Sequence, residues 1–197
     1  PTTTKRSLFY VIVILKSFDI SPEIYTKGVT AITAHVPPKP DYYARVKSTC
    51  YLLNAMVDLE ARRNNVGFGI WYDQDGYLTE SSTENVAIVS PDGIFKYPRF
   101  DHMLRGTTLG RATELAKELV ADGTLKGVSQ TDITKQEVYD SPEMLILTST
   151  FFVIPVVEYD GKAIGAGKPG PVFQKLSELF KRDKAEGREV LTPVPYL

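Results

Sequence analysis

Short apolar runs separated by turn residues constrain the fold of this chain more than any other feature of its sequence. The runs occupy residues 8–14, 29–36, 68–72, 77–79, 86–89, 94–97, 144–147 and 153–159. Runs of this length are typical of β-strands, because helices generally need ten residues or more. Tight turns support this assignment, since Asp73-Gln-Asp-Gly76 and Ser90-Pro-Asp-Gly93 each carry a glycine where a hairpin favours one. The chain is therefore expected to build a sheet of many short strands.

Three segments show the periodicity of amphipathic helices instead. The first ends at residues 64–67 and places four apolar residues on one face: Leu52, Ala55, Met56 and Leu59. The second covers residues 108–120 and carries the apolar stripe Leu109, Ala112, Ala116 and Leu119. The third lies near residues 172–182. Few helices beside many strands predict an α+β fold with a large, largely antiparallel sheet.

The charge balance and the cysteine count exclude several classes of protein. Lys and Arg number 23 against 24 Asp and Glu, so the net charge of -1 gives no reason to expect a nucleic-acid or membrane partner. No apolar run approaches the ~18 residues of a membrane span. Cys50, His35 and His102 are too few for a structural zinc site, which needs about four ligands, so no metal is expected. The single cysteine, expected to be buried at the start of the first helix, indicates a soluble intracellular protein in a reducing compartment.

A glycine-rich segment matches a nucleotide-binding pattern without its context. Residues 165–170, Gly-Ala-Gly-Lys-Pro-Gly, fit G-x-G-x-x-G literally. No strand–helix–strand unit surrounds them, and too little chain follows for the acidic ribose partner. The segment is interpreted as a loop that needs a permissive backbone before the last helix.

Four further segments are ambiguous when each is considered alone. They contain a lysine before a helix, a glutamate between two strands and two pairs of hydroxyl residues: Lys47, Glu80, Thr107 with Thr108, and Ser149 with Thr150. Most lysines are solvated, a glutamate near a turn is often a surface carboxylate, and a threonine at a helix start is usually an N-cap. Each segment by itself therefore favours a structural role.

Together these segments resemble the catalytic-domain pattern of fold-type IV aminotransferases. This pyridoxal-phosphate (PLP) family contains the branched-chain and D-amino-acid aminotransferases and aminodeoxychorismate lyase. The matching motifs are V-K-S-x-x-Y-L, D-x-D-G-Y-L-x-E-x-x-x-x-N-V, L-x-G-T-T, the later hydroxyl pair, P-V-V-x-x-D-G-x-x-I-G-x-G-K-x-G-P and the V-P-Y ending. The resemblance covers nearly the whole chain and is closest to plant-type D-amino-acid aminotransferase-like members. It implies the large catalytic domain of that fold, a pseudo-barrel with flanking helices, and pyridoxal 5'-phosphate as cofactor.

The resemblance also implies a role for each candidate site residue. Lys47 would form a Schiff base with the cofactor aldehyde and move the substrate's α-proton. Glu80 would keep the pyridine nitrogen protonated. The phosphate contacts would fall on four hydroxyl residues: Thr107, Thr108, Ser149 and Thr150. Leu104 would pack on the ring face, and Tyr51 would hydrogen-bond the ring phenolate. The hypothesis requires all of these residues to converge around one flat phosphorylated ring.

The family pattern further implies a division of the chain. Residues 1–36 would be a remnant of the family's small N-terminal domain with its last strands. Residues 37–46 would be an interdomain linker, stiffened by Pro37, Pro38 and Pro40, and residues 47–197 the large PLP-binding domain. By this pattern, most of the small domain, which supplies an arginine to the phosphate in the family, would be missing from this sequence. Ser81 and Ser149 stand where glycine is common.

Three functions remain open at this stage. A transaminase would move an amino group between a branched-chain or D-amino acid and a 2-oxo acid, and this interpretation is favoured. A lyase of the aminodeoxychorismate type would use the same lysine on another substrate. An inactive relative would serve as a structural or interaction subunit. The expected partners are the small-molecule substrates, together with a second copy in a homodimer or a complementing N-terminal segment or subunit.

Overall fold

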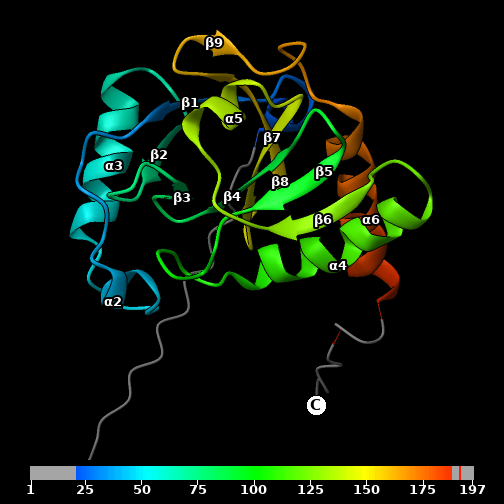
Figure 1. The fold of residues 1–197 in the computed structure, drawn as a ribbon, viewed down its shortest axis with the longest axis horizontal. Helices are drawn as coiled ribbons and strands as arrows, with labels where there is room; N and C mark the ends of the chain where they lie inside the picture. The colour runs from blue at the N-terminus through cyan, green and yellow to red at the C-terminus, as the bar shows by residue number, and fades with distance from the viewer. Residues whose placement is uncertain (1–20, 188–190, 192–197) are drawn as a thin grey trace, which may run out of the picture.

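The computed structural model describes residues 21–187 and Leu191, which form a mixed sheet with helices packed around it (Figure 1). The strands are β1 (Val29–Thr33), β2 (Phe68–Tyr72), β3 (Leu78–Ser81), β4 (Asn85–Val89), β5 (Ile94–Tyr97), β6 (Gly127–Gln130), β7 (Glu143–Thr148), β8 (Phe152–Tyr159) and β9 (Lys162–Ala163). The helices are α1 (Glu23–Thr26), α2 (Asp41–Ala44), α3 (Leu52–Arg63), α4 (Thr107–Ala121), α5 (Lys135–Tyr139) and α6 (Pro171–Glu186). None of these helices is long and apolar enough to cross a lipid bilayer. The strand expected at residues 8–14 lies outside the described residues.

The sheet closes on itself. Its described strands follow the order β3-β2-β1-β8-β7-β4-β5-β6, with β9 paired to β8. Because β3 also pairs with β4, through Glu80 and Asn85, the path from β3 to β4 forms a barrel. Most neighbours are antiparallel, although β1 runs parallel to β2 and β8, and β5 runs parallel to β6. The predicted α+β fold, with a largely antiparallel, barrel-like sheet and flanking helices, is confirmed.

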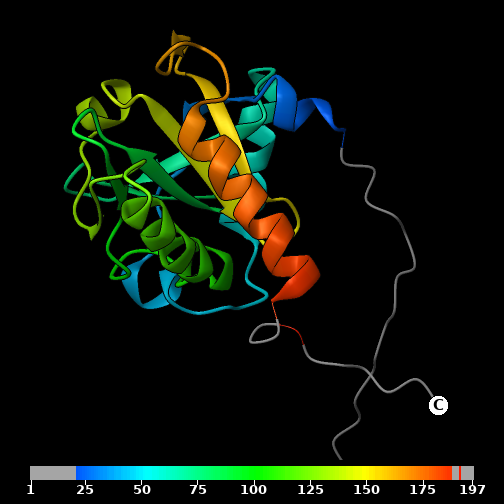
Figure 2. The same cartoon turned by 90° about the vertical axis from the view of Figure 1, so that its right-hand side faces the viewer.

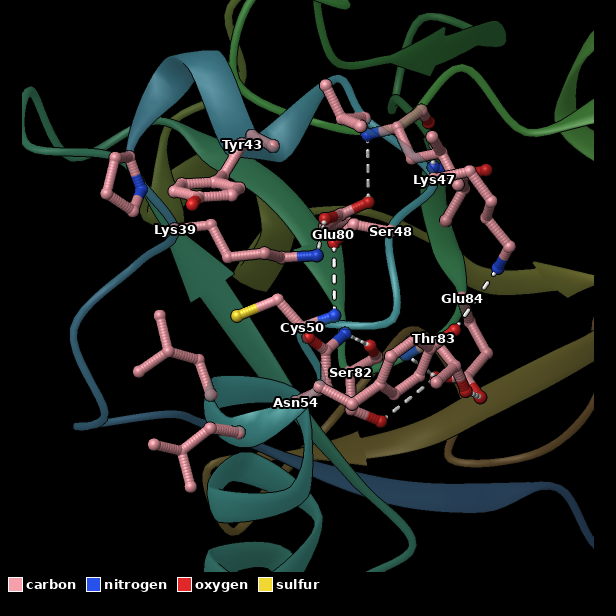
Figure 3. A pocket seen from close by; sticks show the side chains of 18 residues that line it. Lys39, Tyr43, Lys47, Ser48, Cys50, Asn54, Glu80, Ser82, Thr83 and Glu84 are labelled. Atoms are coloured by element: carbon pink, nitrogen blue, oxygen red, sulfur yellow. Dashed lines mark hydrogen bonds and ion pairs between the residues drawn. The ribbon is translucent and has the colours of Figure 1, made fainter. Parts of the chain in front are cut away.

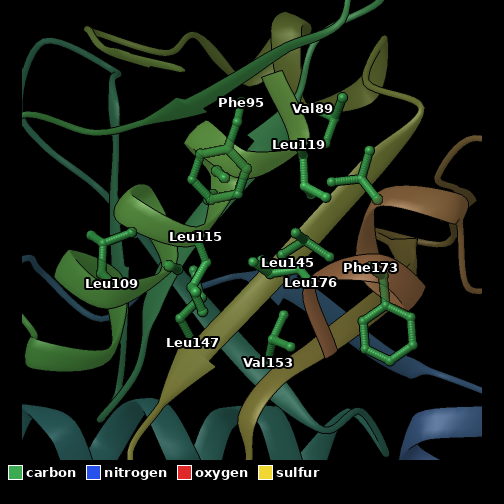
Figure 4. Close-up of a cluster of buried hydrophobic side chains, with 14 of the residues drawn as sticks. Val89, Phe95, Leu109, Leu115, Leu119, Leu145, Leu147, Val153, Phe173 and Leu176 are labelled. Carbon is green, nitrogen blue, oxygen red and sulfur yellow. The ribbon is translucent and has the colours of Figure 1, made fainter. Parts of the chain in front are cut away.

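The central strands bury apolar side chains on both faces, which explains their unbroken apolar sequences. Along β4, Val86 and Ile88 belong to one buried cluster, whereas Ala87 and Val89 belong to another. The second cluster fills the space between the sheet and helices α4 and α6 (Figure 4). Figure 2 shows α6 crossing the sheet beside α4. This packing fixes the direction in which α4 points.

Helix α3 confirms the first expected helix but not its expected buried face. Its buried residues are Asn54, Val57 and Ala61. All four members of the predicted apolar stripe are exposed instead: Leu52, Ala55, Met56 and Leu59. The helix packs closely on β2, since a Cβ on Gly69 would lie 2.5 Å from the Val57 side chain. Close packing selects the face with small side chains, which periodicity alone does not reveal.

The sequence analysis missed several short elements and misplaced one side chain. Strand β6 is only partly buried and pairs with β5, so its sequence carries little apolar signal. Helix α5 begins with a capping box between Thr134 and Glu137, a signal that the sequence does contain. Cys50 is exposed rather than buried, because it precedes α3 instead of lying within it. The division of the chain at residues 37–46 stays a prediction.

The carboxylate of Glu143 on β7 caps the start of α6. Its two oxygens accept hydrogen bonds of 2.8 Å from the backbone N–H groups of Val172 and Phe173. Glu143 is 7% exposed, and a Cβ on Gly170 would collide with its carboxyl group. A carboxylate at a helix N-terminus satisfies otherwise unpaired donors and interacts favourably with the helix dipole. This contact fixes the start of α6 to the sheet.

Replacing Glu143 by alanine should lower the free energy of unfolding by roughly 1–3 kcal/mol, because two buried N–H groups lose their acceptor. Urea denaturation measures the change. Glu143→Gln, which keeps one acceptor oxygen, should lose less. Glu178→Ala on the exposed side of the same helix is the control and should change stability little. Equal losses for the two alanine variants would contradict a capping role.

Candidate functional site

Two adjoining cavities lie beside the β3–β4 pairing that closes the barrel. The first, of about 290 Å³, is lined by residues between 39 and 54, by residues of the segment 80–85 and by Leu104 (Figure 3). The second, of about 330 Å³, is lined mainly by residues 104–108 and 147–149. The two share four lining residues: Lys47, Thr83, Asn85 and Leu104. They form one hollow, of a size that small-molecule ligands occupy.

Lys47 lies between α2 and α3, where both cavities meet. Its side chain is exposed and extends toward Tyr51, the N-cap residue of α3. The Nζ atom donates a hydrogen bond of 3.2 Å to the Tyr51 hydroxyl. Figure 3 shows the Lys47 side chain directed away from Glu80, although both residues line the first cavity. Lys47 and Glu80 therefore line the same cavity, as expected, but their side chains do not contact each other.

Glu80 on β3 is the buried charge of the hollow. One carboxylate oxygen, Oε2, accepts a 3.0 Å hydrogen bond from the backbone N–H of Leu104. The other, Oε1, lies 2.7 Å from the ammonium of Lys39, without the alignment of a hydrogen bond from any described group. Burial raises the pKa of the Glu80 carboxyl, and the nearby Lys39 charge opposes this rise. The Glu84 carboxylate adds a smaller effect in the same direction as burial.

A tight turn holds the connection between β3 and β4. The Glu84 carboxylate accepts from the backbone N–H of Thr83 at 3.0 Å and also from the Thr83 hydroxyl. The Asn54 side chain of α3 donates to the carbonyl oxygen of Ser82. These contacts tie the turn to α3 and fix the wall of the first cavity. The buried hydroxyl of Ser81 has no hydrogen-bond partner in the described part of the chain.

The N-terminus of α4 opens into the second cavity. Thr107 and Thr108 are the first residues of the helix, and both line this cavity. Gly106 is the N-cap and supplies no side-chain hydrogen bond, and the first turn carries no acidic residue. The Asn85 side chain donates 2.8 Å to the carbonyl oxygen of Leu104, and a Cβ on Gly106 would collide with its Oδ1. Asn85 thus holds the loop that aims α4 at the cavity.

The turn after β7 brings one hydroxyl of the expected pair to the hollow. Ser149 lines the second cavity together with Thr148. Thr150 is exposed and lines neither cavity. The structure therefore brings seven of the eight predicted site residues to the hollow: Lys47, Tyr51, Glu80, Leu104, Thr107, Thr108 and Ser149.

A comparison with known families assigns the chain. Residues 5–159 match the sequence profile of the family described as amino-transferase class IV. The chain is a class IV aminotransferase family member. The resemblance found in the sequence motifs is thereby confirmed.

Individual members of this family and related structures match most of the chain. The D-amino-acid transaminase, chloroplastic, of Arabidopsis thaliana is 36% identical over 198 residues, or 100% of this chain and 52% of that protein. A T.th. branched-chain amino acid aminotransferase, solved with N-(5'-phosphopyridoxyl)-L-glutamate, matches with a TM-score of 0.74 at 26% identity, over 80% of this chain and 52% of that one. A putative 4-amino-4-deoxychorismate lyase from Legionella pneumophila shares the fold, with a TM-score of 0.68 at 20% identity, over 79% of this chain and 56% of that one. The chain spans about half the length of these proteins.

The sequence analysis missed one charged residue of the hollow. Lys39 stands between Pro38 and Pro40, within the segment expected to be a linker. Its side chain is only 17% exposed and contacts Glu80. No local sequence signal indicates that Lys39 contacts Glu80, which is distant in the chain. The flanking prolines indicate only that the segment is stiff.

Replacing Gly106 by alanine should disturb the loop before α4, because the new Cβ meets the Asn85 side chain. We expect the free energy of unfolding to fall by roughly 1–3 kcal/mol in chemical denaturation. Gly110→Ala in the same helix is the matched control. Nothing lies within 4 Å of a Cβ there, and alanine should stabilise the helix by up to about 1 kcal/mol.

Combining Gly106→Ala with Asn85→Ala should cost less than the sum of the two single losses, because the colliding amide is removed. Additive losses, or equal stability of the Gly106→Ala and Gly110→Ala variants, would contradict the proposed contact.

Proposed function

We propose that this chain binds pyridoxal 5'-phosphate and transfers an amino group between an amino acid and a 2-oxo acid. The observation that carries the proposal is the single hollow onto which Lys47, Glu80 and the N-terminus of α4 all open. An amine, a carboxylate and an anion-binding helix end are the three groups that this cofactor requires. The relatives named above, one of them solved with a phosphopyridoxyl group, support the same interpretation.

The separation of Lys47 from Glu80 suits the shape of the cofactor. In PLP, the aldehyde carbon and the ring nitrogen lie at opposite ends of the pyridine ring. An amine that bonds the aldehyde and a carboxylate that holds the nitrogen must therefore approach from opposite sides. Lys47 and Glu80 line the same cavity, and the Lys47 side chain, which is hydrogen-bonded to Tyr51 and directed away from Glu80, would have to turn back toward the cavity to reach the aldehyde carbon.

The carboxylate of Glu80 fits a protonated ring nitrogen. Its Oε1 atom is buried and faces the Lys39 ammonium at 2.7 Å, and as a carboxylate oxygen it has a further lone pair to which a pyridine N–H would donate. When bound, the cofactor supplies an electron sink for the substrate's α-carbon. Lys47 would bind the aldehyde carbon with loss of water and, once the substrate's amino group replaces it there, the freed amine would carry a proton to and from the substrate.

The start of α4 fits the phosphate group. The backbone N–H groups of a helix's first turn point outward, and the dipole of a 15-residue helix favours an anion there. The hydroxyls of Thr107, Thr108 and Ser149 line the same cavity. The expected phosphate contact of Thr150 receives no support from its position and stays a prediction.

The substrate proposal is a D-amino acid or a branched-chain amino acid, because the named relatives act on these classes. A lyase of the aminodeoxychorismate type is the second candidate, favoured by the fold shared with the Legionella pneumophila protein. The two differ in their products, since only a transaminase passes the amino group to a 2-oxo acid. The inactive-subunit hypothesis finds no support in the placement of Lys47 at the hollow.

The proposed partner is a second copy of the chain or a complementing N-terminal segment or subunit. Exposed large apolar side chains on α2, on α3 and between them support this proposal, and three of them, Tyr43, Val46 and Leu52, also line the first cavity. The exposed thiol of Cys50 supports the expected reducing compartment.

Borohydride reduction in the presence of PLP should fix the cofactor on Lys47, because reduction makes the bond between the amine and the aldehyde carbon permanent. Mass spectrometry of peptides locates the adduct. Lys47→Ala should lose the adduct, whereas Lys181→Ala, at an exposed position of α6, should keep it.

Incubation of the PLP-loaded protein with amino acids and a 2-oxo acid then separates the two enzyme candidates. Formation of the new amino acid indicates a transaminase. An adduct elsewhere in the chain, or none, would refute both enzyme proposals.

A further inference from the structure

A second lysine is built into the hollow on the side opposite Lys47. The Lys39 ammonium lies 2.7 Å from Glu80 Oε1, and the two side chains are 17% and 6% exposed. Both residues line the first cavity, and Figure 3 shows the two head groups meeting while Lys47 points elsewhere. A pair this sheltered is screened little by solvent and salt.

The backbone holds Lys39 in this position. The indole N–H of Trp71 on β2 donates 2.9 Å to the carbonyl oxygen of Val36, which anchors the segment that leads to Lys39. The Lys39 ammonium also lies 5.1 Å from the centre of the Trp71 ring, a cation–π distance. Prolines on both sides of Lys39 restrict the segment further. Several contacts therefore hold the Lys39 side chain in the conformation that faces Glu80.

Glu80 needs such a partner because its surroundings oppose a charge. Burial raises the pKa of its carboxyl, the Glu84 carboxylate acts in the same direction, and the Lys39 ammonium and the Leu104 N–H act against both. A neutral carboxyl group cannot attract a pyridinium nitrogen. Only the ionised form provides the charge that keeps the ring nitrogen protonated.

We propose that Lys39 is a positioning residue for the cofactor: its ammonium keeps Glu80 ionised and turned toward the hollow, where the ring nitrogen binds. The inference rests on the proposed function, since it assigns a role in binding the same cofactor. In this proposal Lys39 acts through Glu80, the residue that it contacts.

The test compares Lys39→Met, which keeps the length and loses the charge, with Lys39→Arg, which keeps the charge. The PLP dissociation constant of each full-length protein is measured by absorbance titration from about pH 6 to about pH 9. At the low end Lys39→Met should bind PLP about tenfold more weakly than the parent, because loss of the ammonium leaves burial and Glu84 unopposed, raises the pKa of the Glu80 carboxyl further and leaves less of it ionised. The deficit should shrink as the pH rises and Glu80 regains its charge. Lys39→Arg should remain close to the parent.

Stability of the cofactor-free protein gives a second readout. A carboxyl whose pKa is raised in the folded state favours folding below its unfolded pKa, and this contribution is lost as the pH rises through the folded pKa. As the pH rises, the free energy of unfolding should therefore fall more in Lys39→Met than in the parent. This difference between the two proteins should vanish when Glu80→Gln is introduced into both. In the Glu80→Gln background, Lys39→Met should also change PLP affinity less than twofold.

Two results would overturn the inference in distinguishable ways. If the parent forms the Lys47 adduct while Lys39→Met binds PLP as tightly as the parent at every pH, Lys39 has no positioning role and the proposed function stands. If the parent itself binds no PLP, the proposed function fails and the inference fails with it.

Discussion

The Glu80 carboxylate is buried at the strand pairing that closes the barrel, and the shape of the hollow follows from how that charge is held. Taking a carboxylate out of water costs several kcal/mol unless charges and donors compensate. Here Lys39 approaches one oxygen and the Leu104 N–H the other. Each compensating group comes from a different segment, so the buried charge ties the proline-rich segment and the loop before α4 to β3.

Asn85, the strand partner of Glu80, connects the same site to the start of α4. Asn85, paired with Glu80 across the two strands, holds the carbonyl oxygen of Leu104 with its side chain. The same amide leaves room only for a glycine at position 106. One pair of residues thus fixes both a carboxylate and the direction of a helix N-terminus. In the proposed function a ring nitrogen and a phosphate of one cofactor would be bound at these two places, so their separation has to be kept, and a shared strand pair keeps it.

Local signals made much of this predictable from the sequence. The strands and α4 follow from short apolar runs, turn glycines and a 3.6-residue stripe, and the motifs around Lys47 and Glu80 indicated the family. The exposed face of α3 was not predictable, because Leu52, Met56 and Leu59 have the spacing of a buried stripe while Val57 fits closer to β2. The position of Thr150 outside the hollow depends on the path of a single turn, which residue types do not specify. The Lys39–Glu80 pair was missed because it depends on tertiary structure alone.

The roles proposed for the two lysines of the hollow are chemically incompatible with each other. Lys39 compensates Glu80 only as a cation, whereas an amine that attacks an aldehyde must first give up its proton. One nitrogen cannot do both at once. The structure separates the tasks: Lys39 is sheltered and faces a carboxylate, while Lys47 is exposed and hydrogen-bonded to the phenol of Tyr51. Because the ring nitrogen and the aldehyde carbon lie at opposite ends of the cofactor, this chemical separation is also a separation in space. A hollow with one lysine at each end is therefore what the proposed chemistry requires.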